Sequence, residues 1–286
     1  MLGRFVRHRG GVIGLSGLVL LLALALALPI VAPNAELATN LSDQFLTPSL
    51  LHPFGTDELG RDVFARTIAG GRISLITAAV AVAVALVVGV PLGLAAGFLG
   101  GWTETAVMRL MDVLLAVPAV LLAMSIIAIL GRGTSSATIA VAIVSIPTFA
   151  RLARSSTLAL KEQDFVLAAR AVGARDSYIA FRTILPNASS PIIVQMAITS
   201  ATAVLLEAAL SFLGLGTRPP EPSWGSLLSA AKGYVREAPW YAIFPGAIVT
   251  AAVLCLDGLA NGLQATFGPR REGARGPSAT TSERSA

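Results

Sequence analysis

Long apolar stretches without charged residues recur along the chain, and short polar segments separate them. A helix that crosses a bilayer needs roughly 20 mainly apolar residues. Six stretches come close to this length: they cover residues 10–35, 73–103, 113–131, 133–150, 183–206 and 238–256, and the last continues past Asp257 to Phe267. The pattern therefore predicts an all-α integral membrane protein with six transmembrane helices.

The first apolar stretch allows two interpretations. Arg4, Arg7 and Arg9 precede it, as basic residues precede the core of a signal peptide. Its apolar part is longer than a typical signal core, however, and no clear small-x-small cleavage site follows it. We expect a signal anchor that stays in the membrane.

The composition agrees with a membrane protein, because 55% of the 286 residues are hydrophobic and 13% are charged, against about 25% charged in an average soluble domain. The basic residues behind the net charge of +5 flank the apolar stretches, which favours contact with membrane lipids over binding of nucleic acid. The single cysteine, Cys255, has no partner for an internal disulfide. His8 and His52 are expected on opposite sides of the membrane, and we expect neither a metal site nor catalytic activity.

The distribution of Lys and Arg predicts the orientation of the chain. If the N-terminus lies in the cytoplasm, 14 of the 21 basic residues fall in cytoplasmic segments. Cytoplasmic loops carry the excess of basic residues in membrane proteins. We therefore expect a multi-pass protein of the cytoplasmic (inner) membrane with both termini in the cytoplasm.

This topology divides the chain into three parts. Residues 1–72 hold an N-terminal tail, the first transmembrane helix and an extracytoplasmic loop. Residues 73–268 form the transmembrane domain, which includes a cytoplasmic loop over residues 151–186. Residues 269–286 are rich in Arg, Gly, Ser and Thr, and this composition predicts a disordered cytoplasmic tail.

The second half of the extracytoplasmic loop is expected to form a short amphipathic helix over residues 57–69, on the outer membrane surface. Its apolar positions recur at near-helical spacing. They are Leu59, Val63, Phe64 and Ile68.

The cytoplasmic loop is patterned too regularly to be a mere connector. A helix is predicted over residues 161–172, with Gly173 ending it, a second helical segment over residues 177–185, and Pro186 as the turn into the fifth span. One face of the first helix gathers Phe165, Ala168, Ala169 and Val172. Such a helix suits the groove of a soluble motor protein, with Arg170 and Arg175 facing acidic groups on it; the alternative is a helix that only rests on lipid headgroups.

The same loop resembles the EAA motif of ABC importer permeases. That motif reads EAA, three residues, Gly, nine residues, Ile-x-Leu-Pro, and the chain matches it without a gap. The matching residues are Leu167, Ala168, Ala169, Gly173, Thr183, Leu185 and Pro186. Thr183 takes the Ile position, and Leu167 replaces the Glu of the motif, which the peptide-importer branch often lacks.

Further segments, in order along the chain, resemble the C-type permease subunit of dipeptide and oligopeptide importers. They are His52-Pro53-Phe54-Gly55-Thr56-Asp57 with Gly60-Arg61-Asp62, Gly100-Gly101-Trp102 with Met108-Arg109-Leu110-Met111-Asp112, Leu210-Ser211-Phe212-Leu213-Gly214-Leu215-Gly216, Pro222-Ser223-Trp224-Gly225, and Ala238-Pro239-Trp240. The matches run from about residue 50 to residue 270, and the ordered set is far more specific than any one of them.

The resemblance implies the fold of a type I ABC importer permease, and a machine of several subunits. A homologous B-type permease would form a heterodimer with this chain, two ATPase subunits would dock under the coupling loops, and an extracytoplasmic peptide-binding protein would deliver cargo. The coupling loop would contact the ATPase through Phe165, Leu167, Ala168, Ala169, Arg170, Gly173, Leu185 and Pro186. Nickel importers share this type of permease, so another small cargo is the alternative to peptide.

The sequence itself leaves ATP hydrolysis to a partner. The phosphate-binding motif G-x-x-x-x-G-K-[ST] requires a Lys after a Gly. The two lysines are Lys161, which follows Leu160, and Lys232, which follows Ala231. We therefore expect no cofactor in this chain, with ATP and magnesium bound by the partner ATPase subunits.

Acidic residues within spans are functional candidates by default. Glu207 and Asp257 are the candidates for the pore or gate; in a proton-coupled transporter, the less favoured alternative, they would carry protons. Asp112 is expected to pair with Arg109 at i, i+3 spacing. Gly89, Gly93 and Gly97 recur every four residues, which predicts close helix packing.

Five residues of the outer loops are candidates for contact with the binding protein. They are Asp57, Arg61, Asp62, Trp224 and Trp240. For the charged residues, pairing among themselves is the alternative; for the tryptophans, it is a role as ordinary anchors at the membrane interface.

Overall fold

The computed structural model describes residues 2–32 and 34–267, and this part of the chain is helical without a β-strand. The helices are α1 (Leu2–Arg7), α2 (Arg9–Val31), α3 (Val63–Leu99), α4 (Gly101–Ala116), α5 (Ala119–Leu130), α6 (Thr134–Leu160), α7 (Asp164–Ala171), α8 (Asp176–Tyr178), α9 (Leu185–Phe212), α10 (Trp224–Ala231) and α11 (Pro239–Phe267). A 3₁₀ turn, Leu41–Asp43, and a π-helix, Ile179–Ile184, complete them. The predicted disordered tail, 269–286, lies outside the described residues.

Five helical segments are long and apolar enough to cross a membrane: Arg9–Leu28, Val63–Leu99, Thr134–Leu160, Asp176–Phe212 and Pro239–Phe267. The α4 and α5 helices form one pair bent by 95°, which brings the number to six if the pair is counted as one span. The third span, expected over residues 113–131, is therefore a bent pair of helices that begins earlier, at Gly101. Pro118 lacks an N–H group and disfavours helical geometry at the residue before it, so Val117 is extended and the helix breaks.

The amphipathic helix expected over residues 57–69 is also corrected. Residues 57–62 form a tight turn that a bridge between Thr56 and Asp62 closes, and α3 starts directly after it. Val63 and Ile68 are buried in the first two turns of α3 because α10 and α11 cover this end of the helix. The apolar spacing was thus a signal for the buried start of a span.

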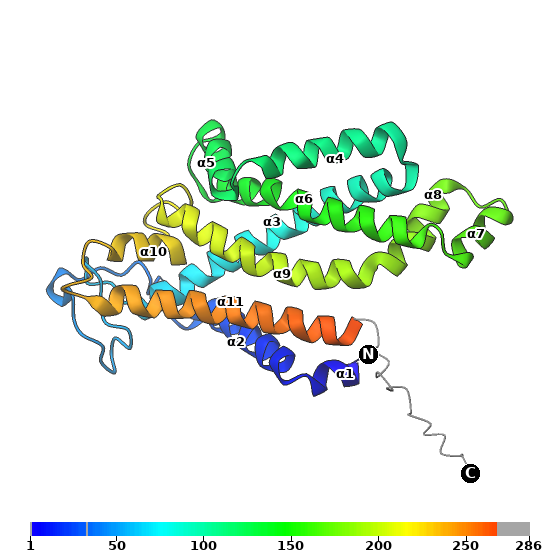
Figure 1. The fold of residues 1–286 in the computed structure, drawn as a ribbon. Helices are drawn as coiled ribbons and strands as arrows, with labels where there is room; N and C mark the ends of the chain where they lie inside the picture. The colour runs from blue at the N-terminus through cyan, green and yellow to red at the C-terminus, as the bar shows by residue number, and fades with distance from the viewer. Residues whose placement is uncertain (1, 33, 268–286) are drawn as a thin grey trace, which may run out of the picture.

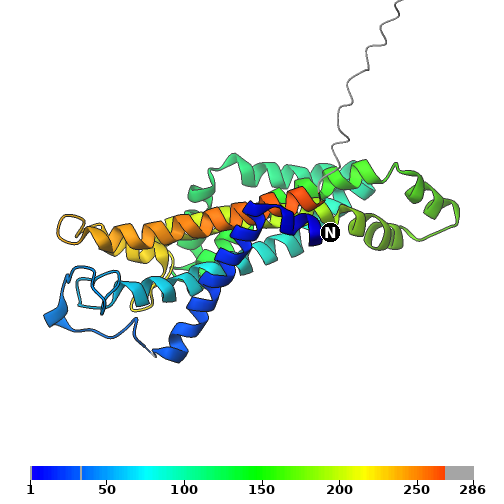
Figure 2. The same ribbon diagram turned by 90° about the horizontal axis from the view of Figure 1, so that it is seen from below.

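The long helices lie along one another, with α3 and α6 in close contact and α9 packed against both (Figure 1). The α2 helix packs against α11. At one end of the bundle α7 and α8 project, and α1 and the end of α11 lie toward the same end; the loop before α3 and α10 lie at the other, as a second view also shows (Figure 2). The predicted coupling loop therefore shares an end with both ends of the described chain.

The predicted glycine face packs α3 against α6. A Cβ atom at Gly93 would lie 2.1 Å from the carbonyl oxygen of Ala150, and one at Gly89 would lie 2.7 Å from that of Ile146. One turn further on, a Cβ atom at Gly97 would lie 2.9 Å from the carbonyl oxygen of Arg154. Between helices in lipid, small residues allow close backbone approach and so provide the packing energy.

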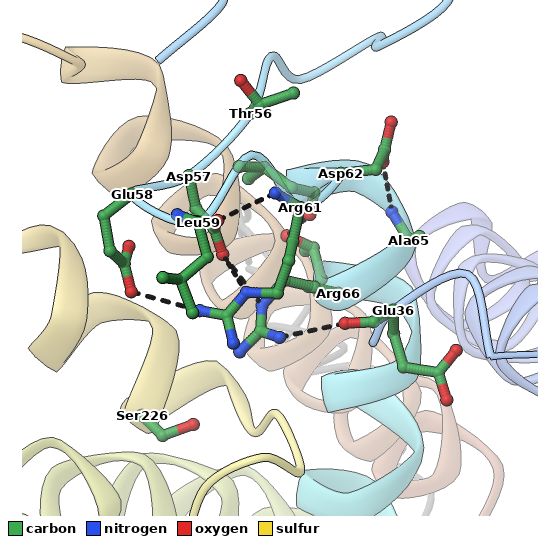
Figure 3. Close-up of polar contacts among 12 residues, drawn as sticks. Glu36, Thr56, Asp57, Glu58, Leu59, Arg61, Asp62, Ala65, Arg66 and Ser226 are labelled. Atoms are coloured by element: carbon green, nitrogen blue, oxygen red, sulfur yellow. Dashed lines mark hydrogen bonds and ion pairs between the residues drawn. The ribbon is translucent and has the colours of Figure 1, made fainter. Parts of the chain in front are cut away.

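The outer loop is tied to α3 by a buried ionic cluster (Figure 3). Asp57 is fully buried, and its Oδ2 atom lies 2.7 Å from Nε of Arg61 and 3.4 Å from Nε of Arg66. Glu58 adds a second carboxylate 3.1 Å from Arg61, and Arg66 donates to the carbonyl oxygen of Glu36 at 2.9 Å. Because both Asp57 oxygens are occupied, the cluster fixes the loop from residue 36 to α3.

Replacing Gly93 by Val is expected to destabilise the bundle by about 1–3 kcal/mol, because the added methyl groups meet the backbone of α6. This destabilisation should appear as a lower melting temperature of the purified variant in mild detergent. Gly233→Val is the matched control, since nothing lies within 4 Å of a Cβ atom at Gly233. Equal melting temperatures for the two variants would contradict the packing argument.

Replacing Asp57 by Ala is expected to loosen the outer loop, because it leaves two guanidinium groups near a buried site without their shared carboxylate. Removing one partner of a buried ion pair costs about 3–5 kcal/mol. Limited proteolysis from the outer side should then cut residues 34–62 sooner than in the unmodified protein. Glu237→Ala, which removes an exposed charge from another outer loop, should leave the rate unchanged.

Candidate functional site

The predicted coupling helix is present as α7, although it is shorter than expected. The sequence predicted a start at Lys161, but α6 continues to Leu160 and α7 begins at Asp164. Residues 151–160, assigned to the loop, are therefore the last turns of α6. Asp164 in the first turn and Arg170 in the last complement the dipole of α7.

Val166 anchors α7 to the end of the bundle. It is fully buried in a cluster with Leu94 of α3 and Ile179, Ala180 and Ile184 of the π-helix. Helical spacing alone did not predict this residue, because it favoured an apolar face made of Phe165, Ala168, Ala169 and Val172. Only Ala169 of that face packs inward. The signal for the true face was the pair Val166 and Ala169, three residues apart.

The opposite face of α7 points away from the bundle and exposes apolar side chains. Phe165 and Leu167 are exposed, and Val172 is 84% exposed. Ala168 is exposed beside them. Arg170 is turned back toward the bundle, with its guanidinium carbon 5.7 Å from the ring centre of Phe98. An exposed apolar face of this kind on a projecting helix is suited to contact with another protein.

Gly173 ends α7 in the manner expected, and its backbone conformation is the reason. Its φ angle is +77°, a region that favours glycine. The N–H of Gly173 donates to the carbonyl of Arg170 at 2.9 Å, and that of Ala174 donates to Ala169 at 3.0 Å, which together form a Schellman motif. Nothing in the described part of the chain lies within 4 Å of a Cβ atom at Gly173, so the site faces away from the bundle.

The chain returns from the loop into the membrane as one continuous helical segment, Asp176–Phe212. The turn expected at Pro186 is therefore wrong: Leu185 and Pro186 open α9 directly after the π-helix. The wide π turn precedes a proline whose ring crowds the carbonyl one helical turn earlier. Because no flexible joint intervenes, displacement of the loop is passed to α9.

Of the outer-loop candidates, the charged residues pair among themselves. Asp57 and Arg61 belong to the buried cluster, so neither offers a free charge to a partner. Asp62 caps α3 by accepting the N–H of Ala65 at 2.7 Å, and it lies 2.8 Å from Nδ1 of His52. Asp62 remains partly exposed.

The two tryptophans differ. Trp224 is 1% exposed, and its indole N–H donates to the carbonyl of Thr67 at 2.9 Å, so its expected place on the surface is wrong. Gly71 of α3 leaves the space that the ring fills. Trp240 is half-buried against the turn at Gly55, and its indole N–H lies 3.4 Å from the carbonyl of Thr56.

The acidic residues of the spans also differ. Glu207 is 1% exposed and accepts the hydroxyl of Ser211 at 2.7 Å within the bundle, so the expected position on a solvated gate is wrong. Asp257 lies on the exposed face of α11 and accepts from Asn261 of the same helix at 3.1 Å. It therefore makes no hydrogen bond to another described helix, and the pore remains the open alternative for it.

Two ion pairs join α4 to α6. Asp112 pairs with Arg151 at 2.6 Å, and not with Arg109 as the sequence predicted. Glu104 pairs with Arg154, whose Nε atom lies 2.8 Å from Oε1. Over the described residues, His, Cys, Asp and Glu side chains do not gather into a group of three that suits a metal ion.

Comparison with known proteins places the chain among membrane permeases. Residues 89–272 match the family described as binding-protein-dependent transport system inner membrane component, and residues 1–53 match the N-terminal TM domain of oligopeptide transport permease C. The dipeptide transport system permease protein DppC of Alkalihalophilus pseudofirmus is 40% identical over 92% of this chain and 87% of its own length. The glutathione transport system permease protein GsiD of Escherichia coli O6:K15:H31 is 41% identical over 94% and 89%.

The fold agrees with these matches. A chain of the MetNI methionine ABC transporter, in an inward-facing conformation, superposes with a TM-score of 0.53 at 20% identity, and the match covers 68% of this chain and 95% of that one. This likeness confirms the ABC importer permease fold that the motifs predicted. The chain belongs to the family of binding-protein-dependent transport system inner membrane components.

Proposed function

We propose that this chain is one of two channel-forming permease subunits in an ATP-driven importer that takes up short peptides across the cytoplasmic membrane. The observation that carries the proposal is the construction of α7. It combines an inward anchor at Val166, an outward apolar face at Phe165 and Leu167, and a rigid connection into α9. These are the properties needed to receive force from a soluble motor and pass it to the membrane.

The partners follow from the family. A homologous B-type permease completes the channel, two ATPase subunits bind ATP and magnesium and dock under the coupling loops, and an extracytoplasmic binding protein delivers the cargo. The chain itself is a non-catalytic subunit without a cofactor of its own. The excess of basic residues at the α7 end favours a cytoplasmic position for that end and for both termini.

The cargo is proposed from the relatives. Dipeptides and glutathione, the cargoes in the names of the two permeases compared, share a free ammonium group, carboxylates and amide bonds. A small peptide of this chemical class is therefore the proposed substrate. Affinity purification of the transporter in mild detergent, with identification of co-purifying subunits and bound ligand, tests both proposals together; a complex without an ATPase would overturn the first.

Replacing Gly173 by Trp is expected to leave membrane insertion intact and to lower peptide uptake at least tenfold. The indole would extend into space that is empty in this chain and that the proposed ATPase fills. Uptake and ATP hydrolysis are to be measured in vesicles that hold the complete transporter. Hydrolysis should persist while uptake is lost.

Gly173→Ala is the matched control, because it introduces the same left-handed backbone strain, about 1–2 kcal/mol, without the bulk of the indole. Its uptake should stay close to that of the unmodified protein. If the Ala variant loses as much uptake as the Trp variant, strain explains the effect. If neither loses uptake, α7 does not dock the motor.

Replacing Phe165 and Leu167 together by Glu is expected to detach the ATPase, because burying each side chain in an interface contributes about 1.5–3 kcal/mol. Both residues are exposed, so the fold of the chain should be unaffected. The amount of co-purifying ATPase should fall at least tenfold. Val235→Glu, the same kind of change at an exposed position of the outer end, should retain the full amount.

A further inference from the structure

An open cavity of about 660 Å³ lies between α4 and α6, outside the coupling loop. Its lining residues are Met108, Asp112, Arg151, Leu152, Arg154 and Ser155. The ion pair between Asp112 and Arg151 crosses it, and the two side chains are 50% and 51% exposed. The cavity is therefore charged, open and bounded by two spans.

The depth of this pair in the membrane follows from the helices. Trp102, at the start of α4, is 84% exposed, as expected for a tryptophan at a membrane interface. Asp112 lies ten residues further along α4, about 15 Å from Trp102 at the rise of an α-helix. Arg151 lies nine residues before the end of α6, about 14 Å from it. Both thus lie within the membrane-spanning part of their helices, inside a hydrocarbon layer about 30 Å thick.

The α4–α6 face that carries Asp112 and Arg151 is unsuited to contact with lipid. A charged side chain at the bilayer centre costs several kcal/mol unless it faces protein or a water-filled cavity. A purely anionic headgroup does not fit either, since two carboxylates, Asp112 and Glu104, balance the two guanidinium groups and such a headgroup offers them no ammonium group. The exposed face of α3 offers a contrast, because Val80, Val84 and Val87 make it apolar.

We infer that the α4–α6 face around Asp112 and Arg151 is a wall of the water-filled translocation path, and that the pair binds the charged ends of zwitterionic cargo in passage. The inference rests on the proposed function. Asp112 is the partner for an ammonium group and Arg151 for a carboxylate. A half-exposed ion pair contributes only about 0–1 kcal/mol, so the pair opens to exchange partners at little cost.

Water access is tested by cysteine labelling of the complete transporter in a Cys255→Ser background. Thr148→Cys lies on the exposed face of α6, one turn from Arg151, and Val87→Cys lies on α3; both are about 18 Å from the inner ends of their helices. A membrane-impermeant maleimide should label Thr148→Cys at least tenfold faster than Val87→Cys in one of two states of the transporter, nucleotide-free or trapped with vanadate. Equal labelling rates for the two cysteines in both states would overturn the inference.

The binding role is tested by neutral variants of the pair, measured as peptide uptake per ATP hydrolysed. Asp112→Asn and Arg151→Gln should each lower this ratio severalfold, and the double variant should be at least as low. A purely structural pair predicts the opposite, since removing both charges together relieves the unpaired charge that each single variant leaves. A double variant that recovers normal uptake would therefore overturn the binding role.

Failure of the labelling or uptake tests can be distinguished from failure of the proposed importer function. The amount of co-purifying ATPase reports on the assembly and should be the same in all of the variants. Loss of the ATPase from the unmodified complex would reject the importer itself. Normal assembly with unlabelled Thr148→Cys would reject only the placement of the path.

Discussion

The close contact between α3 and α6 is the constraint on which the rest of the structure depends. In lipid there is no hydrophobic driving force between helices, so packing of backbones must supply it. Gly89 and Gly93 bring α3 onto the backbone of α6, and α9 then packs against both. Because α3 carries the outer ionic cluster at one end and the pocket for Val166 at the other, this contact sets the position of both functional ends.

Rigid helical elements connect the α7 end of the bundle to the α10 end. The coupling loop contains a Schellman turn at Gly173 and then enters α9 through a π-helix without a flexible break. At the outer end, Trp224 inserts α10 between α3 and α9, held by its indole hydrogen bond to Thr67. A displacement at α7 therefore reaches α10 through stiff elements. That is the mechanical requirement for a permease whose motor and cargo lie on opposite sides of the membrane.

Apolar length was enough to find the spans, because the bilayer admits only helices of a fixed length. It was not enough to find the bend at Pro118, since an uninterrupted apolar run continues on both sides of it. The coupling motif placed Gly173 correctly, whereas periodicity in so short a helix assigned the wrong face to α7. Trp224 and Glu207 were misplaced for a common reason: their burial depends on α10 folding back between spans, a contact far away in sequence.

The partners of charged residues were also hard to predict from local spacing. Local spacing paired Asp112 with Arg109, but the partner is Arg151, 39 residues away on α6. Because Asp112 and Arg151 come from different helices, their ion pair lies on a face that α4 and α6 form together. A pair buried between helices would need only packing to explain it, whereas this pair is half exposed between two membrane-spanning helices. The cost of placing it against hydrocarbon favours protein or water as its neighbour, and the inferred translocation path supplies the water.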